Sequence, residues 1–215
     1  MRVHTLGTKT VQSKGGVARK LLGIVGSRSL GYDQAGHVGD IVDTILGMGY
    51  HIATGGAIGT DHYVLERLMD IGRPQDGTIF SAWSQYPGFP AMVRSRVRQF
   101  KELGGHLVWG LSPGKEDPLK IRVALLARNH KLVEACHGVI AFITGGSRGT
   151  IYTIKKAVEK RKPLVVFPAS AKAMAGRPSS SFYDAGLLPE LETVKWVPLR
   201  CGGAWEGAFK AVYLR

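Results

Sequence analysis

The sequence predicts an α/β fold in which helices cover both faces of a parallel sheet. Short apolar runs alternate along the chain with longer segments whose apolar residues recur at helical spacing. Glycine-rich turns follow several of these runs, and 29 glycines in 215 residues suit a domain with many such turns. Strands that alternate with helices pair in parallel, because each helix carries the chain back across the sheet.

The clearest unit is the strand, turn, helix and strand of residues 138–167. Residues 138–143 are continuously apolar, residues 151–161 have helical spacing, and residues 163–167 form a second apolar run. The turn between the first strand and the helix carries glycines, two hydroxyls and an arginine. Backbone N–H groups at such a turn face an anion readily. We interpret this turn as a phosphate-binding loop formed by Gly145, Gly146, Ser147, Arg148, Gly149 and Thr150.

Two earlier turns have the same character. Residues 21–25 predict a first strand that ends at Gly26, Ser27 and Arg28, and a helix follows over residues 33–46. Residues 50–54 predict a second strand, and the turn after it contains Gly55, Gly56, Gly59, Thr60 and Asp61. Asp61 lies in the first turn of the next helix, where it either caps the backbone or accepts a hydroxyl of a bound nucleotide.

The remaining elements follow the same alternation. Further strands are expected at residues 78–80, 106–109 and 193–197, and further helices at residues 91–103, 120–135 and 204–214. The last of these helices would close a single domain that spans residues 20–215. Residues 1–19 are expected to form a basic, flexible arm, and residues 168–181 a flap of small residues.

Three aromatic residues lie in the loop after the third strand, namely Trp83, Tyr86 and Phe89. Exposed, they would form a surface on which nucleobases stack. Packed, they would anchor a long loop, and we expect this of at least two of them.

The formal net charge of +13 is concentrated in particular segments. Residues 1–20 carry five basic groups and no acid, residues 91–131 carry nine basic groups against three acids, and residues 148–177 carry eight against one. Such a field favours polyanions, although a basic surface that serves only solubility remains the alternative. No apolar run is long enough to span a membrane, and the first twenty residues lack the apolar core of a secretion signal.

Candidate catalytic groups are scattered. No spacing of histidines and cysteines suggests a metal site, and Cys136 and Cys201 are expected to be reduced, partly buried thiols. The predicted turns bring together hydroxyls, glycines and arginines, which suit binding better than bond cleavage. We therefore expect neither a metal nor a cofactor, and we favour a binding protein over an enzyme.

These motifs, in this order, resemble the SLOG superfamily of Rossmann-like domains. The resemblance covers about residues 20–168 and rests on the turns at residues 23–28, 53–61 and 145–150 and on Arg128 and Asn129. Within the superfamily the chain is most similar to the DNA-processing protein A (DprA/Smf) family, which has a Tyr-Pro pair where this chain has Tyr86 and Pro87. His130 departs from the arginine that often ends the family's Arg-Asn-Arg motif.

The resemblance implies a cytoplasmic protein that binds single-stranded DNA, passes it to a recombinase and works as a homodimer. The pocket residues would be those of the glycine-rich turns together with Arg128 and Asn129, with Arg28, Arg128 and Arg148 holding phosphates. The resemblance further suggests that Arg128→Ala would weaken polyanion binding without unfolding the protein.

The alternative is a small nucleotide-binding member of the superfamily (YspA-like) that senses or processes a free nucleotide. Phosphoribohydrolases of the same fold carry a catalytic glutamate three residues after the last threonine of their loop. Thr153 stands at that position here, which argues against their activity.

Overall fold

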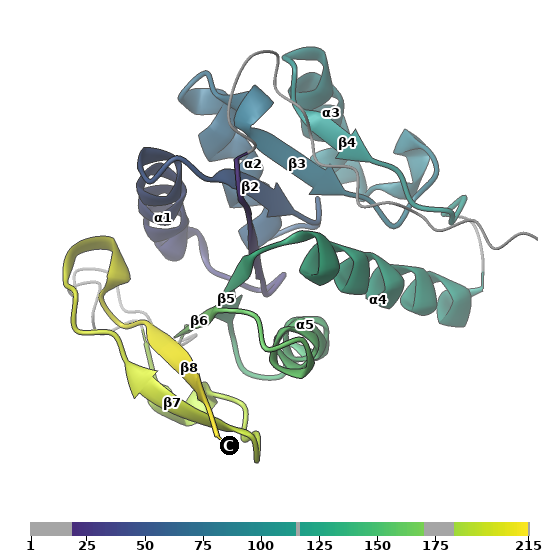
Figure 1. Cartoon of the computed structure of the whole chain (residues 1–215). Coiled ribbons are helices and arrows are strands. Elements are labelled where there is room, and N and C mark those ends of the chain that lie inside the picture. The colour runs from purple at the N-terminus through teal and green to yellow at the C-terminus, as the bar shows by residue number, and fades with distance from the viewer. Residues whose placement is uncertain (1–18, 115–116, 170–182, 215) are drawn as a thin grey trace, which may run out of the picture.

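The computed structural model describes residues 19–114, 117–169 and 183–214. Within these residues, eight strands form one sheet in the order β4-β3-β2-β1-β5-β6-β8-β7 (Figure 1). Among β1 to β6, all strands that lie next to each other in the sheet pair in parallel. Strand β8 is antiparallel to both of its neighbours, β6 and β7. The strands are β1 (Leu21–Gly26), β2 (His51–Thr54), β3 (Gly77–Phe80), β4 (His106–Val108), β5 (Gly138–Ile143), β6 (Leu164–Pro168), β7 (Val194–Pro198) and β8 (Phe209–Tyr213).

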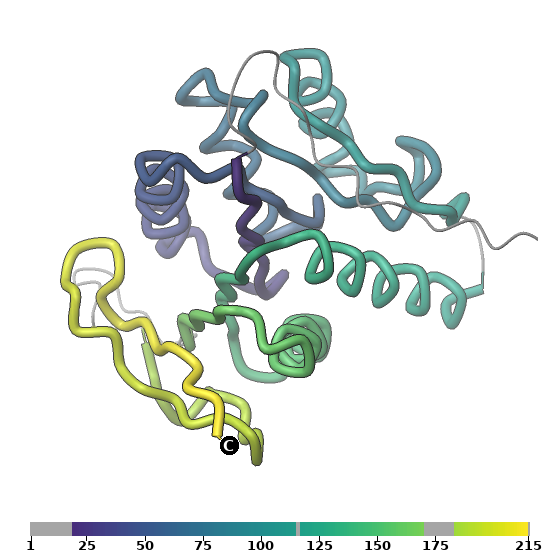
Figure 2. Tube along the Cα trace, in the orientation of Figure 1, coloured from purple at the N-terminus to yellow at the C-terminus, as the bar shows by residue number. Residues whose placement is uncertain are grey.

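Five α-helices of the described residues cover the two faces of this sheet. They are α1 (Ala35–Gly47), α2 (Thr60–Asp70), α3 (Ala91–Glu102), α4 (Pro118–Ala135) and α5 (Arg148–Glu159). The tube in Figure 2 shows α1, α2 and α3 on one side of the strands and α4 and α5 on the other. The predicted α/β fold, with a mainly parallel Rossmann-like sheet between two helical layers, is confirmed.

Successive side chains of the central strands point to opposite faces of the sheet, and each face has its own hydrophobic core. In β1, the buried side chain of Ile24 joins the cluster under α1, α2 and α3, and Val25 joins the cluster under α4 and α5. In β5, Ile140 and Ala141 divide in the same way. Strands that are apolar on both faces are typical of a parallel sheet covered by helices on both sides.

The carboxyl-terminal helix predicted for residues 204–214 is wrong. The structure has a short 3-10 turn at Gly203–Trp205 and then strand β8. In β8, Phe209, Ala211 and Tyr213 are half-buried while the two residues between them are exposed, which is the period of a strand. Gly207, with a φ of 78°, separates the turn from the strand and stops a helix there.

Other expectations have mixed outcomes. Trp83 and Phe89 are buried, so the prediction that at least two of the three loop aromatics pack is confirmed. Cys136 is buried, and this burial raises the pKa of its thiol to about 12, whereas Cys201 is exposed and was wrongly expected to be partly buried. The arm, apart from Arg19, and nearly all of the predicted flap lie outside the described residues.

The order of strands fixes where a ligand can bind. From β1 the chain moves to β2 through α1 on one face, and from its neighbour β5 it moves to β6 through α5 on the other face. The loops after β1 and β5 therefore diverge and leave a crevice between them. In open α/β sheets, ligands bind outside the carboxyl ends of the strands at such a point.

Candidate phosphate-binding site

A cavity of about 530 Å³ lies at this crevice. It is formed by the turns after β1 and β5, the first turns of α5 and one flank of α4. All six residues predicted for the turn after β5 line it, from Gly145 to Thr150. The other predicted residues that line it are Gly26, Arg28, Asp61, Arg128 and Asn129. The structure thus brings together eleven of the predicted site residues, from four separate segments of the chain.

The turn after β5 is open on the cavity side. A Cβ atom added at Gly146 or at Gly149 would have no atom within 4 Å. The hydroxyl of Ser147, the residue before α5, lies 2.8 Å from the hydroxyl of Thr150 and makes no capping bond to the helix backbone. The N–H groups of Ser147 and Arg148 donate to the carbonyls of Thr144 and Gly146 over 3.3 and 2.9 Å. The next N–H groups, in the first turn of α5, have no partner inside the helix and can donate to an anion.

Arginines supply the positive charge of the cavity. Arg28, Arg122 and Arg148 line it and are exposed. The positive end of the α5 dipole adds to their field. The Asn129 side chain donates a hydrogen bond of 3.3 Å to the carbonyl of Gly149 and so links α4 to the start of α5. The site therefore combines fixed backbone donors with side-chain cations.

Hydroxyl groups hold the two strand-end turns together. The Thr144 N–H donates to the Ser27 hydroxyl over 2.8 Å, and the Ser29 hydroxyl lies 2.8 Å from that of Thr144. Ser27 is fully buried and does not line the cavity. The predicted site residue Ser27 therefore fixes the position of the turn after β5 and does not itself face the cavity.

The turn of residues 55–61, by contrast, is filled by the protein itself. A Cβ atom at Gly55 would lie 1.1 Å from Nη1 of Arg128, and one at Gly59 would lie 2.4 Å from the Ser27 carbonyl oxygen. Thr60 is buried, and its hydroxyl faces the same carbonyl at 3.4 Å. Gly55, Gly56, Gly59 and Thr60 are absent from the cavity wall. Their small size is needed for packing.

Arg128 and Asp61 form a buried ion pair under the cavity floor. Nη1 of Arg128 lies 3.3 Å from Oδ2 of Asp61, and the two residues are 7% and 4% exposed. Oδ2 also accepts a 3.1 Å bond from the Ala57 N–H. Burial raises the pKa of the Asp61 carboxyl against the opposing charge of Arg128. Burial lowers the pKa of the Arg128 guanidinium, and the nearby charge of Arg28 lowers it further.

This ion pair changes the expectation for Arg128. Its Nε and the Oδ1 of Asp61 are buried without a hydrogen-bond partner in the described structure, so the pair already contains unmet polar groups. Removing one charge would leave the other buried and uncompensated. The sequence-based expectation that Arg128→Ala leaves the fold intact is therefore replaced by an expected loss of stability. Asp61 is the buried ionic partner of Arg128, a role beyond the two that the sequence suggested for it.

Sequence reasoning missed several residues of the wall, among them Arg122, Ser29 and Tyr152. A signal existed for Arg122. It precedes Asn129 by seven residues, which places both side chains on the same flank of a helix. Thr153, at the position of the phosphoribohydrolase glutamate, also lines the cavity and donates a 3.0 Å bond to the Gly149 carbonyl.

Among the described residues, no group of three or more His, Cys, Asp or Glu side chains is placed to hold a metal ion. No helix in the described part of the chain has the length and apolar character needed to cross a membrane.

The structure is a Rossmann-like α/β domain with a cavity at the switch point of its sheet. The family model described as DNA recombination-mediator protein A matches residues 12–186. The chain belongs to this family, and its resemblance to the SLOG superfamily and to DprA is confirmed. A comparison with curated protein sequences finds no match.

Solved structures support the same assignment of fold. DNA processing protein A from Streptococcus pneumoniae matches with a TM-score of 0.57 at 20% identity, over 72% of this chain and 52% of that one. DNA processing protein A from Helicobacter pylori, described for its single-stranded DNA binding mode, matches with a TM-score of 0.55 at 22% identity, over 71% and 67%. A molybdenum cofactor binding protein from Rippkaea orientalis matches with a TM-score of 0.50 at 15% identity, over 73% and 80%. The chain thus spans about half the length of the S. pneumoniae protein.

Proposed function

We propose that this protein binds single-stranded DNA through its phosphates and acts in DNA processing and recombination. The observation that carries the proposal is the open turn at the start of α5, surrounded by three exposed arginines. Membership of the recombination-mediator family supports it. So does the likeness to the H. pylori protein, whose structure is described for its mode of binding single-stranded DNA.

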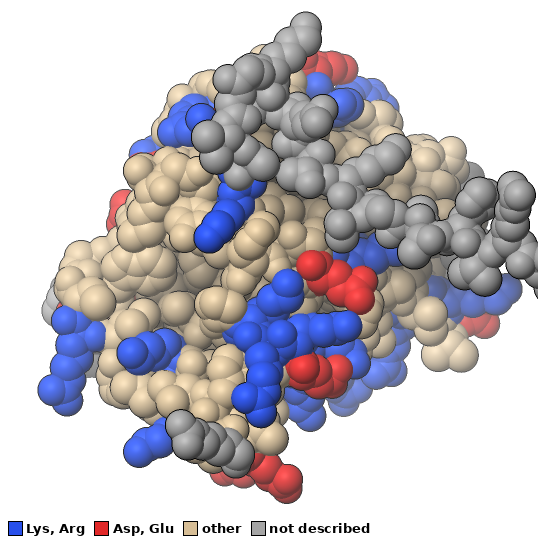
Figure 3. Space-filling view, viewed as in Figure 1, with Lys and Arg blue, Asp and Glu red and all other residues tan. Residues whose placement is uncertain are grey.

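The chemistry of the cavity suits a phosphodiester. Each phosphate carries one negative charge and accepts hydrogen bonds, and the cavity offers both backbone donors and guanidinium groups. Lys and Arg side chains also gather over α4 and α5 on the face drawn in Figure 3, with acidic side chains beside them.

The proposal is tested by fluorescence anisotropy of a labelled single-stranded oligonucleotide at several salt concentrations. Each phosphate contact contributes about 0.7 to the slope of log affinity against log salt concentration. Arg148→Ala should weaken binding and reduce this slope by about 0.7. The matched control is Arg200→Ala, because Arg200 is exposed and lies outside the cavity wall. Equal binding by both variants and the unchanged protein would contradict the site.

The strand preference tests the function separately. A protein that processes single strands should bind them more tightly than a duplex of the same length. Equal and weak binding to both forms would overturn the proposal. The assignment to DNA also implies the remaining features of such proteins, namely a homodimer, a recombinase partner and a cytoplasmic location. Sedimentation of the purified chain and a pull-down with a recombinase test the first two.

A free nucleotide is the second candidate ligand. Leu125, Leu126 and Tyr152 line the same cavity beside the phosphate-binding turn, so one nucleotide could bury its base and sugar there. Thermal unfolding with a panel of nucleotides distinguishes the two ligands. A nucleotide that stabilises the protein at micromolar concentration, and that competes with DNA, would favour this second candidate.

A further inference from the structure

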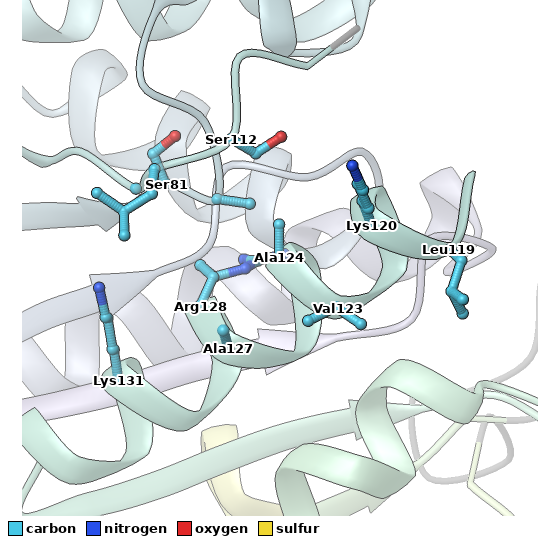
Figure 4. Close-up of a pocket in the computed structure, with 12 residues that line it drawn as sticks. Ser81, Ser112, Leu119, Lys120, Val123, Ala124, Ala127, Arg128 and Lys131 are labelled. Atoms are coloured by element: carbon cyan, nitrogen blue, oxygen red, sulfur yellow. The ribbon is translucent and has the colours of Figure 1, made fainter. Parts of the chain in front are cut away.

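The other flank of α4 lines a second cavity. It has a volume of about 420 Å³ and lies between α4 and the residues that follow β3 and β4. Figure 4 shows Ala124 and Ala127 of α4 on one side and Ser81 and Ser112 on the other. Arg128 lines both cavities. The buried guanidinium of Arg128 thus lies beneath α4, between two cavities on opposite flanks of the helix.

The wall opposite α4 is preformed by hydrogen bonds between two loops. The Gly110 N–H donates to the Trp83 carbonyl over 2.8 Å, and the Ser112 N–H donates to the Ala82 carbonyl over 3.2 Å. The loops approach so closely that a Cβ atom at Gly110 would lie 2.3 Å from the Ala82 carbonyl oxygen. Because these hydrogen bonds already fix the wall, binding of a ligand does not cost the entropy of ordering the loops.

The lining of this groove is apolar, and its side chains are mostly small. Ala82 and Gly110 lie on the loop wall, and Ala124 and Ala127 lie on the helix wall. At its margin, Leu111 and Leu119 are 87% and 68% exposed and extend the apolar surface of the groove. Small side chains on two facing walls leave room for a flat apolar group.

Two lysines stand at opposite ends of the groove. Lys120 and Lys131 both line it, and Figure 4 shows them near the two ends of the helix segment that forms its wall. Their separation along α4 is about 16 Å, from the rise of 1.5 Å per residue in an α-helix. The groove thus offers an apolar centre with a cation at either end, which complements an apolar group that carries negative charges on both sides.

We propose that this groove binds a nucleobase of the single strand whose phosphates occupy the neighbouring cavity. The inference rests on the proposed function. The two cavities share Arg128, so a strand that crosses α4 at this point places phosphates on one flank and a base on the other. Lys120 and Lys131, at the two ends of the groove, attract phosphates that precede and follow this nucleotide along the strand. A peptide with apolar and acidic residues has similar chemistry, but the continuity with the phosphate cavity favours DNA.

The test uses two oligonucleotides with equal numbers of phosphates, one of thymidines and one of abasic sites. The groove is filled by Ala127→Leu, since Ala127 is an exposed residue of its wall. The matched control is Ala135→Leu, because Ala135 is exposed on the same helix and lies outside the groove. Anisotropy gives the affinity of each protein for each oligonucleotide, and thermal unfolding verifies that each variant folds.

The expected result is a selective loss. Ala127→Leu lowers the affinity for the thymidine oligonucleotide by about 5-fold or more, the cost of overfilling a packed site, and leaves the affinity for the abasic one unchanged. Ala135→Leu changes neither affinity. A loss of the same size for both oligonucleotides would overturn the base site, and so would no loss for either, the result expected if the groove serves a peptide.

A second measurement needs no variant. The unchanged protein should prefer the thymidine oligonucleotide over the abasic one by at least about 5-fold, because only the former buries a base in the groove. Equal, salt-dependent binding of both would overturn the base site and leave the phosphate site standing. If neither oligonucleotide binds, the proposed function fails and the base site fails with it.

Discussion

The turn of residues 55–61 and the turn of residues 145–150 have similar sequences and opposite surroundings. Each follows a parallel strand, contains three glycines and leads into a helix. In the first, a Cβ atom at Gly55 or Gly59 would overlap neighbouring atoms. In the second, a Cβ atom at Gly146 or Gly149 would meet nothing within 4 Å. The glycines of the first turn are enclosed by the protein, although Ala57 and Asp61 reach the cavity wall, whereas the glycines of the second turn face open space.

The difference comes from what lies above each turn. α4 crosses the first turn and inserts Arg128 against Gly55, so the buried partner of Asp61 takes the space that a ligand would need. The second turn lies on the far flank of α4, where the Asn129 side chain donates a hydrogen bond to the Gly149 carbonyl. A glycine-rich turn thus indicates that some group lies close to the backbone. Whether that group is a side chain of the protein or a bound ligand depends on the fold around the turn.

The largest effect on stability is expected from breaking the ion pair under the first turn. Arg128→Met leaves Asp61 buried and unpaired, which should lower the free energy of unfolding by about 3–5 kcal/mol. The matched control is Arg122→Met, an exposed arginine on the same helix, with a change within about 0.5 kcal/mol. Urea unfolding followed by circular dichroism measures both.

A loss below about 1 kcal/mol for Arg128→Met would mean that the pair is not the structural centre of the first turn. The double variant with Asp61→Asn sharpens this test. It removes the uncompensated charge and should recover part of the stability.

The next effect compares one positive-φ glycine from each turn. Gly59 and Gly146 have φ angles of 78° and 80°, at which alanine is strained, and the ψ of −130° at Gly59 adds to the strain there. Only at Gly59 does the added Cβ meet a backbone oxygen, at 2.4 Å. Gly59→Ala should therefore cost about 1–3 kcal/mol more than Gly146→Ala in the same unfolding experiment. Equal costs would show that the two turns are not packed differently.

The smallest effect has the opposite sign. Gly149 lies in the first turn of α5, where an added methyl group has open space. Gly149→Ala should stabilise the protein by about 0.5–1 kcal/mol, because alanine loses less conformational entropy in a helix. The same methyl group should hinder a phosphate and weaken DNA binding, measured by anisotropy. Stabilisation without weaker binding would separate this residue from the site.

The sequence predicted the repeating elements well and the environment of the glycines poorly. The strands at residues 21–25 and 138–143 were predictable because their side chains are apolar on both faces. The helix expected at residues 204–214 failed because pairing with β6 and β7 selects a strand there. No local pattern states that Arg128 reaches Gly55, since 73 residues separate them in the chain. That contact depends on the path of α4 over the sheet edge, which only the fold defines.

The most direct test is a titration of ¹⁵N-labelled protein with a single-stranded oligonucleotide, followed by the backbone amide resonances. If the turn after β5 binds phosphate, the amides of Gly146 and Gly149 shift progressively with added DNA. Those of Gly55 and Gly59, enclosed by Arg128 and by the Ser27 carbonyl, shift far less. The reverse pattern, or shifts confined to regions outside both turns, would contradict the assignment of one open and one closed turn.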